Sequence, residues 1–364
     1  MPDPKHCCAA VLLAFTPLSA VMADAQAADL TGMRSNTHLA GYAFVDYVSP
    51  ENGDGAFTQA GFNPIFHYLY DDRVLVEAEL EIALDEQGQT ETNLEYATID
   101  LFLSDTTVLV AGKFLSPLGN FRQNLHPAWI NRFASAPVGF AHDGAAPTND
   151  IGVQLRGVFA GTPVGRITYA LALTNGPTLA AEDGALEGVM TEGKTATATG
   201  SALLGGRLGL IPVSWMDIGL SYAAGRTRVA EDEAGEVEDE PARDYRFYGA
   251  DFVSRPWKPL EFRGEYARQH AGAAIDSVAP DEADWTAWYL QAAWRIAGTP
   301  AEAVVRYGRF DAAVDERSQK QWGLGVNWWL TASTVVKAGY ELNDALEDGV
   351  DIGDRALLQV AHGF

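Results

Sequence analysis

Carboxylates at alternate positions are the first residues whose spacing points to a chemical role. Glu77, Glu79 and Glu81 alternate with apolar residues in the run 74–84. Because successive side chains of a strand point to opposite faces, a strand here places the carboxylates on one face and apolar residues on the other. Unpaired charge is costly to bury, so the charged face needs water. This pattern indicates a strand with lipid on one face and a water-filled lumen on the other, although an edge strand of a soluble sandwich also alternates.

Residues that could carry other chemistry do not form recognisable groups. The histidines are scattered and lack the paired spacing of a zinc site. His142 and Asp143 could form an acid–base pair, but no serine nucleophile is identifiable beside them. No glycine-rich loop joins a strand to a helix, so a phosphate-binding loop is not indicated. We therefore expect no metal, no cofactor and no enzymatic activity.

The N-terminus has the features of a secretory signal peptide over residues 1–27. Lys5 precedes an apolar stretch from Ala9 to Val21, and Ala25–Ala27 fits the small-x-small cleavage pattern. Cleavage there would leave residues 28–364 as one domain.

Cysteine usage and charge narrow the class further. Cys7 and Cys8 are the only cysteines, and cleavage would remove both, which leaves no thiol for a disulfide, a zinc site or a nucleophile. The formal net charge of −24 argues against nucleic acid as a partner.

The rest of the chain repeats one pattern of alternating segments separated by turn-like or loop-like connections. Short and long connections alternate strictly, as in bacterial outer-membrane barrels, where the turns on one side are short and the loops on the other are long. The pattern predicts an all-β fold, a transmembrane antiparallel β-barrel of about 16 strands. The predicted strands are 38–47, 57–70, 73–85, 92–103, 106–114, 150–159, 165–174, 201–210, 216–227, 243–254, 257–269, 284–296, 301–310, 318–329, 333–343 and 355–364.

The chain ends on an aromatic residue, Phe364, on the apolar face of the last predicted strand. This resembles the C-terminal signature of outer-membrane barrels, although His362 on the same face departs from it. We therefore expect the protein in the outer membrane of a Gram-negative bacterium.

The longest connection, Leu115–Asn149, is the third of the long loops and is rich in aromatic residues. A loop of this length usually has a function, and its apolar side chains need a surface to pack on. A barrel of this size has a lumen wide enough for an aqueous channel. We expect the loop to fold inward and to carry Arg122 and Arg132 to the narrowest point. The alternative is an outward loop that caps the barrel or contacts a neighbouring subunit.

Four segments resemble the phosphate-selective porin O/P-like family. They are Ala111–Gly119, His126–Ile130, Asn149–Leu155 and Tyr169–Pro177. The resemblance implies a sixteen-stranded outer-membrane channel, typically a homotrimer, whose third loop folds into the pore.

The resemblance also implies basic pore residues at matching positions, and the strand pattern adds others. Basic residues in pores favour anions, and an opposing row formed by Glu77, Glu79 and Glu81 would create a transverse field. We expect weak anion preference, with phosphate among the possible solutes, or near-neutrality. The predicted pore bases are Lys113, Arg122, Arg132 and Arg156 from the resemblance, with Arg166 and Arg207 from the strand pattern.

Two other functions are compatible with parts of this pattern. An outer-membrane barrel enzyme would need a nucleophile and a base near the barrel rim. A secreted, soluble β-rich protein that binds carbohydrate would have no reason to sort its connections by length. The expected partners are outer-membrane lipid, ions or small solutes in transit, and two further copies of the chain.

Overall fold

The computed structural model describes residues 35–364, except 85–86, 142–143, 191–192, 198, 233–234, 238 and 348. The predicted signal peptide and the pair His142–Asp143 lie outside the described residues. No helix in the described part of the chain is long and apolar enough to cross a membrane.

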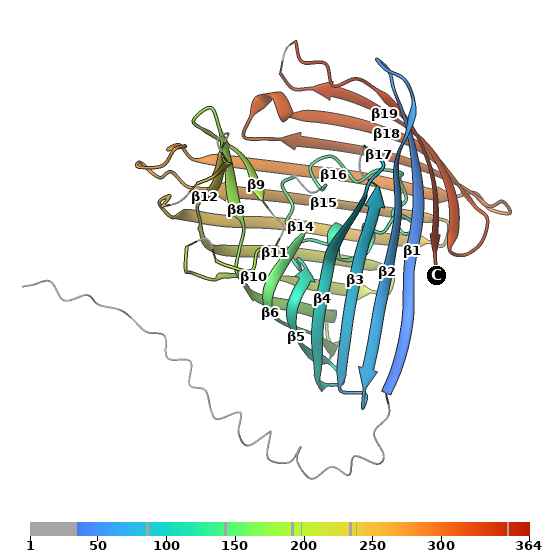
Figure 1. Ribbon diagram of the computed structural model, residues 1–364. Helices are drawn as coiled ribbons and strands as arrows, with labels where there is room; N and C mark the ends of the chain where they lie inside the picture. Colours follow the sequence, from blue (N-terminus) through green and yellow to red (C-terminus); the bar gives the residue numbers. More distant parts are fainter. Residues whose placement is uncertain are drawn as a thin grey trace, which may run out of the picture.

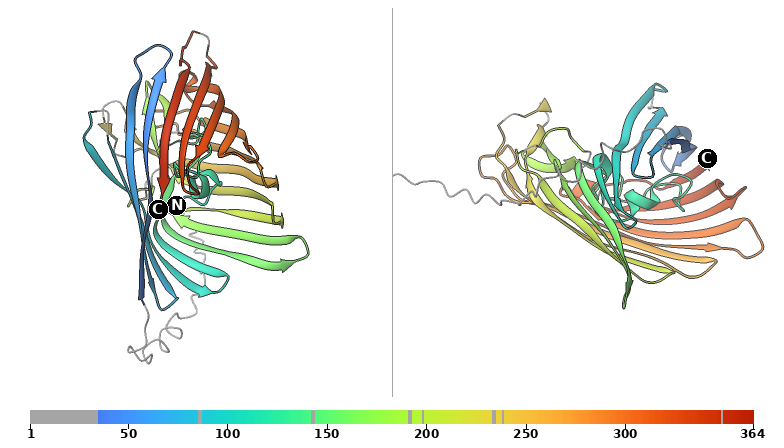
Figure 2. Two further views of the ribbon diagram at one scale, coloured as in Figure 1. Left: turned by 90° about the vertical axis from the view of Figure 1, so that its right-hand side faces the viewer. Right: turned by 90° about the horizontal axis from the view of Figure 1, so that it is seen from below.

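Sixteen antiparallel strands of the described chain form one closed barrel, as the sequence predicted. Each strand pairs with its neighbours in chain order, and the last strand pairs with the first, from Tyr42↔Gly363 to Pro50↔Arg355. Figures 1 and 2 show this closure, with the first strands (blue) beside the last (red). The barrel strands are β1 (Ser35–Pro50), β2 (Ala56–Tyr70), β3 (Val74–Leu84), β4 (Thr90–Ser104), β5 (Thr107–Leu115), β6 (Asn149–Thr162), β7 (Gly165–Thr174), β10 (Leu203–Val213), β11 (Met216–Thr227), β14 (Arg243–Trp257), β15 (Leu260–Ala271), β16 (Ala283–Arg295), β17 (Ala301–Asp311), β18 (Gln319–Trp329), β19 (Thr334–Ala345) and β20 (Arg355–Gly363).

Strand β18 shows why these segments form a barrel wall. Trp322, Leu324, Val326 and Trp328 are 48–52% exposed, while the residues between them, Gly323, Gly325 and Asn327, face inward. A closed barrel satisfies every backbone group internally, so an apolar outer surface of this kind can face lipid. Closure also contradicts the alternative of a soluble sandwich with open edges.

The C-terminal aromatic lies on this outer surface. Phe364 is 46% exposed, and its ring stacks on Phe62 of β2 at a centroid distance of 5.7 Å. His362 is exposed on the same face and lies beside Thr334 of β19.

Two long connections contain strands that the sequence reading missed. They form a second sheet of four strands in the order β13-β12-β8-β9. Figure 1 shows β8, β9 and β12 at one end of the barrel, beside the ends of the middle strands. These strands are β8 (Thr178–Glu182), β9 (Ala185–Met190), β12 (Val229–Asp232) and β13 (Gly235–Glu236).

This small sheet covers part of the barrel mouth. The indole nitrogen of Trp285 on β16 donates to the carbonyl oxygen of Glu187 on β9 at 3.2 Å, and Arg317 pairs with the Glu187 carboxylate at 3.0 Å. The hairpin β8–β9 therefore reaches from the β7–β10 side of the barrel to β16 and the connection after β17.

Candidate functional site

The described part of the connection between β5 and β6, residues 116–141 and 144–148, lies inside the barrel. Its first part is held by the inner wall: the backbone N–H groups of Asn120 and Phe121 donate to the carboxylate of Glu265 on β15, at 3.1 and 2.7 Å. Gly119 has a φ of +96°, and a Cβ there would lie 1.9 Å from the same carboxylate. Only glycine allows the loop to approach Glu265 this closely.

The middle of the loop is held by the ammonium group of Lys337 on β19. This buried group donates to the carbonyl oxygens of Ala128, Asn131 and Phe133, and to the side chain of Gln359 at 2.7 Å. One lysine thus satisfies three loop carbonyl groups that would otherwise be buried without partners. The predicted inward path of the loop agrees with these contacts.

Aromatic residues of the loop fill shallow depressions in the wall. Phe133 packs over Gly323, Gly325 and Gly339, where any added Cβ would lie 2.9–3.0 Å from its ring. The missing side chains of these glycines on β18 and β19 leave room for the ring.

A second aromatic contact holds the start of the loop and a later part of it against β16. Phe121 and Phe140 contact each other and Tyr289 of β16, with ring centroids 5.1–6.3 Å apart. The loop therefore covers the inner wall from β15 to β20 and faces β2–β4 across the lumen.

A charged side chain of the loop contacts this facing wall. Arg122, in the π-helical turn η3 (Phe121–Leu125), pairs with Glu95 of β4 at 2.5 Å. Their side chains are 12% and 6% exposed. The register between β3 and β4 shifts at this point, because Glu79 pairs with Tyr96 while Leu80 pairs with Leu94.

Glu95 is the extra residue of this bulge. A bulge redirects side chains, and here Glu95 and Tyr96 are both buried. Glu95 was not among the predicted pore residues, because the alternation of apolar and polar residues does not show where a bulge occurs.

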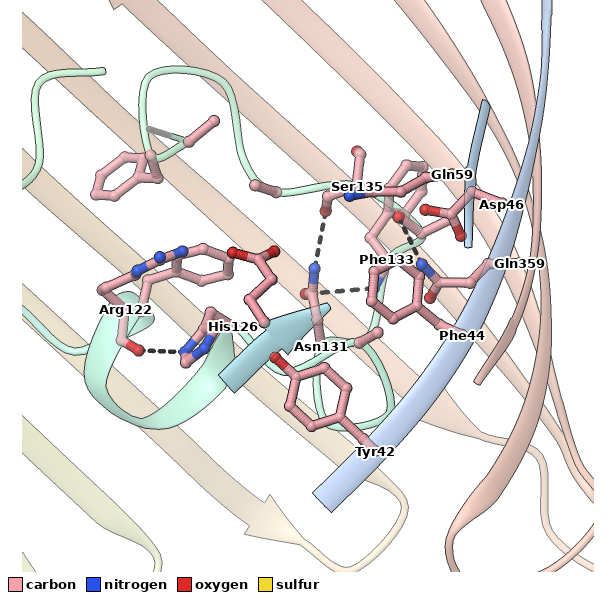
Figure 3. A pocket seen from close by; sticks show the side chains of 17 residues that line it. Tyr42, Phe44, Asp46, Gln59, Arg122, His126, Asn131, Phe133, Ser135 and Gln359 are labelled. Atoms are coloured by element: carbon pink, nitrogen blue, oxygen red, sulfur yellow. Dashed lines mark hydrogen bonds between the residues drawn. The ribbon is translucent and has the colours of Figure 1, made fainter. Parts of the chain in front are cut away.

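Two cavities flank this ion pair. The first, of about 210 Å³, lies between the loop and the first strands, and we call it the β1-side cavity (Figure 3). Its polar wall includes Asp46, Gln59 and Glu81, and Arg122 and His126 face it from the loop. The second, of about 270 Å³, is the β6-side cavity; its lining includes Gln123, Val108, Arg156, Thr168 and Arg207.

The predicted carboxylate row points inward. Val76, Leu80 and Leu84 on the alternate positions of β3 are exposed on the outer face. Glu77 pairs with His67 at 3.2 Å and remains partly exposed. Glu79 is 2% exposed and accepts from Asn63 at 3.4 Å, so the structure surrounds it with protein, contrary to the expectation that it lines water.

The structure contradicts the assignment of Lys113 to the lumen. Lys113 pairs in register with Ala97 and Ile151, two positions from the exposed residues Ile99 and Val153. It therefore lies on the outer face near the end of β5, where its ammonium group donates to the carbonyl oxygen of Leu94 at 2.7 Å.

Arg132 lies between the loop and the wall. Its guanidinium is 3.7 Å from Glu261 and 3.5 Å from Glu302, and it lies over the ring of Trp329. Neither cavity is lined by Arg132. The expectation that it faces the narrowest point of the lumen therefore finds no support in its contacts.

Three other predicted bases belong to the inner wall. Arg156 pairs with Asp100 at 2.7 Å, and Arg207 pairs with Asp251 at 2.6 Å and with Asp217. Both line the β6-side cavity. Arg166 is exposed near the turn between β6 and β7 and lines neither cavity.

A metal site does not emerge from the geometry. Among the described residues there is no group of three or more histidine, cysteine or acidic side chains that could hold an ion.

No protein-family model and no curated protein sequence matches the chain. Its fold is similar to that of the outer-membrane channel DcaP of Acinetobacter baumannii, with a TM-score of 0.64, 9% identity, and coverage of 91% of this chain and 97% of that one. It is also similar to OmpF of Salmonella typhi, with a TM-score of 0.60, 12% identity, and coverage of 90% and 97%.

A third similar structure is an anion-selective porin from Comamonas acidovorans. The TM-score is 0.58, the identity is 14%, and the match covers 91% of this chain and all of the other, 100%. At these identities the likeness establishes a shared fold, the sixteen-stranded barrel of porins.

Proposed function

We propose that this chain is an outer-membrane channel through which small hydrophilic solutes and ions diffuse passively. The observation that carries the proposal is the two-sided wall: the outer face is apolar, and the inner face is polar, with an inserted loop that leaves cavities beside it. A barrel with these faces can lie in lipid and hold water inside.

The location and assembly belong to the same proposal. Residues 1–27 act as a cleaved signal peptide, and residues 28–364 insert into the outer membrane of a Gram-negative bacterium. The mature protein is a homotrimer. The neighbours in fold support this, since one of them, OmpT of Vibrio cholerae, is described as a trimer.

We further propose a channel with little preference between cations and anions. Arg122, Arg156 and Arg207 each stand beside a carboxylate, so the inner wall presents ion pairs more than free positive charge. Phosphate and other anions then pass the channel without being preferred over other solutes. The dense positive lining that favours anions would require bases without such partners.

Reconstitution in a planar lipid bilayer tests the proposal. Purified mature protein should give discrete steps of conductance, and a salt gradient should give a reversal potential close to zero. Liposomes that contain the protein should swell in solutions of small uncharged sugars. Protein that folds as a β-rich species and yet conducts no ions and passes no sugar would contradict a channel function.

A further inference from the structure

The ion pair between loop and wall lies between the two cavities. Arg122 lines the β1-side cavity and the next residue, Gln123, lines the β6-side cavity, so η3 lies between the two. The partner residue, Glu95, lies on β4. That strand separates β1–β3, which carry Asp46 and Glu81, from β5–β10, which carry Arg156 and Arg207.

The pair differs from the loop contacts that Lys337 and Glu265 make. The contacts of Lys337 and Glu265 hold the loop against strands that it already covers. The pair of Arg122 with Glu95 instead joins the loop to the facing wall. A contact between a guanidinium and a carboxylate is a charge-assisted hydrogen bond, among the stronger contacts that side chains make.

We propose that Arg122 and Glu95 form a bar across the lumen that restricts passage between the β1-side and β6-side cavities, and that Glu95 determines ion preference together with Arg122. This inference rests on the proposed channel function. While the pair is closed, its two charges cancel, and the space between loop and wall is occupied by the two side chains.

Replacing either residue of the pair should widen the lumen, but the two replacements should change the charge of the lumen in opposite directions. Glu95→Gln removes one negative charge beside Arg122, which favours anions. Arg122→Gln removes one positive charge beside Glu95, which favours cations.

The test measures single-channel conductance and reversal potential for four proteins: wild type, Glu95→Gln, Arg122→Gln and the double variant. Both single variants should conduct more than wild type and should pass larger uncharged sugars in liposome swelling. Their reversal potentials should shift in opposite directions. The double variant should conduct about as well as either single variant, because the same bar has been removed, and its reversal potential should lie between theirs.

Glu91→Gln is the matched control. Glu91 lies on the same strand, is exposed, and lines neither cavity. This variant removes the same charge as Glu95→Gln but leaves the bar in place, so conductance and the sugar size limit should stay at the wild-type values. Heat-dependent gel mobility checks that every variant has folded.

Three results would overturn the proposal. The first is an unchanged conductance in folded Glu95→Gln protein. The second is a shift of both single variants in the same direction, since that indicates that the pair only holds the loop in place. The third is an increase in the conductance of the double variant that equals the sum of the increases in the two single variants. If the wild-type protein forms no channel at all, the proposed channel function itself is contradicted. That result differs from the three above, which contradict only the role of the pair.

Discussion

Arg306 of β17 and Glu341 of β19 form an ion pair at 3.0 Å inside the barrel, and their side chains are 1% and 0% exposed. The guanidinium of Arg306 also donates to the backbone carbonyl of Ser135 in the inserted loop, at 2.8 Å. The pair therefore links two wall strands to the loop in a place that water does not reach.

Replacing Arg306 with methionine should destabilise the folded barrel. Breaking a buried pair typically costs about 3–5 kcal/mol, and the loss here should fall below that range because Glu341 keeps a second partner, Arg355. The folded protein has a heat-dependent mobility on denaturing gels, and the temperature at which its band disappears should fall. Arg309→Met is the control, because Arg309 pairs with Asp311 on the surface, with side chains 43% and 40% exposed, and exposed pairs contribute about 0–1 kcal/mol. Equal losses in the two variants would contradict the structural role given to Arg306.

Phe133→Ala should loosen the loop. Its ring fills the depression over the glycines of β18 and β19, and removal of a buried phenylalanine typically costs about 3–5 kcal/mol. We expect a lower unfolding temperature together with noisier and larger conductance steps. Phe159→Ala, on the outer face and 58% exposed, should leave the conductance as it is. Identical channel records for the Phe133 variant and wild type would mean that the ring does not hold the loop.

Leu80 and Glu79 test which face of β3 meets lipid. Leu80→Arg should impair assembly, since a cation on the lipid-facing surface near the membrane midplane costs about 2–4 kcal/mol. Glu79→Gln should assemble, because Asn63 can still donate to the neutral amide oxygen. The assembly of both variants is measured by the yield of folded protein in outer membranes, which is recognised by its heat-dependent gel mobility. Tolerance of Leu80→Arg combined with loss of Glu79→Gln would reverse the assignment of the faces.

Lys113 and Arg156 should differ in their effect on ion preference. Arg156 lines the β6-side cavity, so Arg156→Gln should shift the reversal potential toward cations. Lys113 lies on the outer face, so Lys113→Gln should leave the reversal potential unchanged. A shift in the Lys113 variant as large as that in the Arg156 variant would place Lys113 in the lumen after all.

The sequence predicted all sixteen barrel strands, because two-residue periodicity and the sorting of short and long connections are local signals. The hairpin β8–β9 was missed although it has a local signal of its own. Asp183 and Gly184 have positive φ angles of 48° and 78°, as an Asp-Gly hairpin turn requires, and apolar residues alternate on both sides.

The site was less predictable than the fold, for physical reasons. Strand β5 has apolar residues on both faces, so alternation gives no signal for the direction of Lys113. Glu95 turns inward at a bulge, and Arg132 turns toward carboxylates supplied by β15 and β17. These placements depend on residues that are distant in the chain.

The attachment of the loop also sets an order of assembly. Residues 116–148 are made early, yet the groups that hold them, among them Glu265, Arg306, Lys337 and Glu341, belong to strands in the second half of the chain. Contacts between distant segments form late, because their chain-closure entropy must be overcome first. During biogenesis the later wall strands must therefore be in place before the loop can bind to them. Narrowing of the lumen by the loop is then among the last steps of maturation.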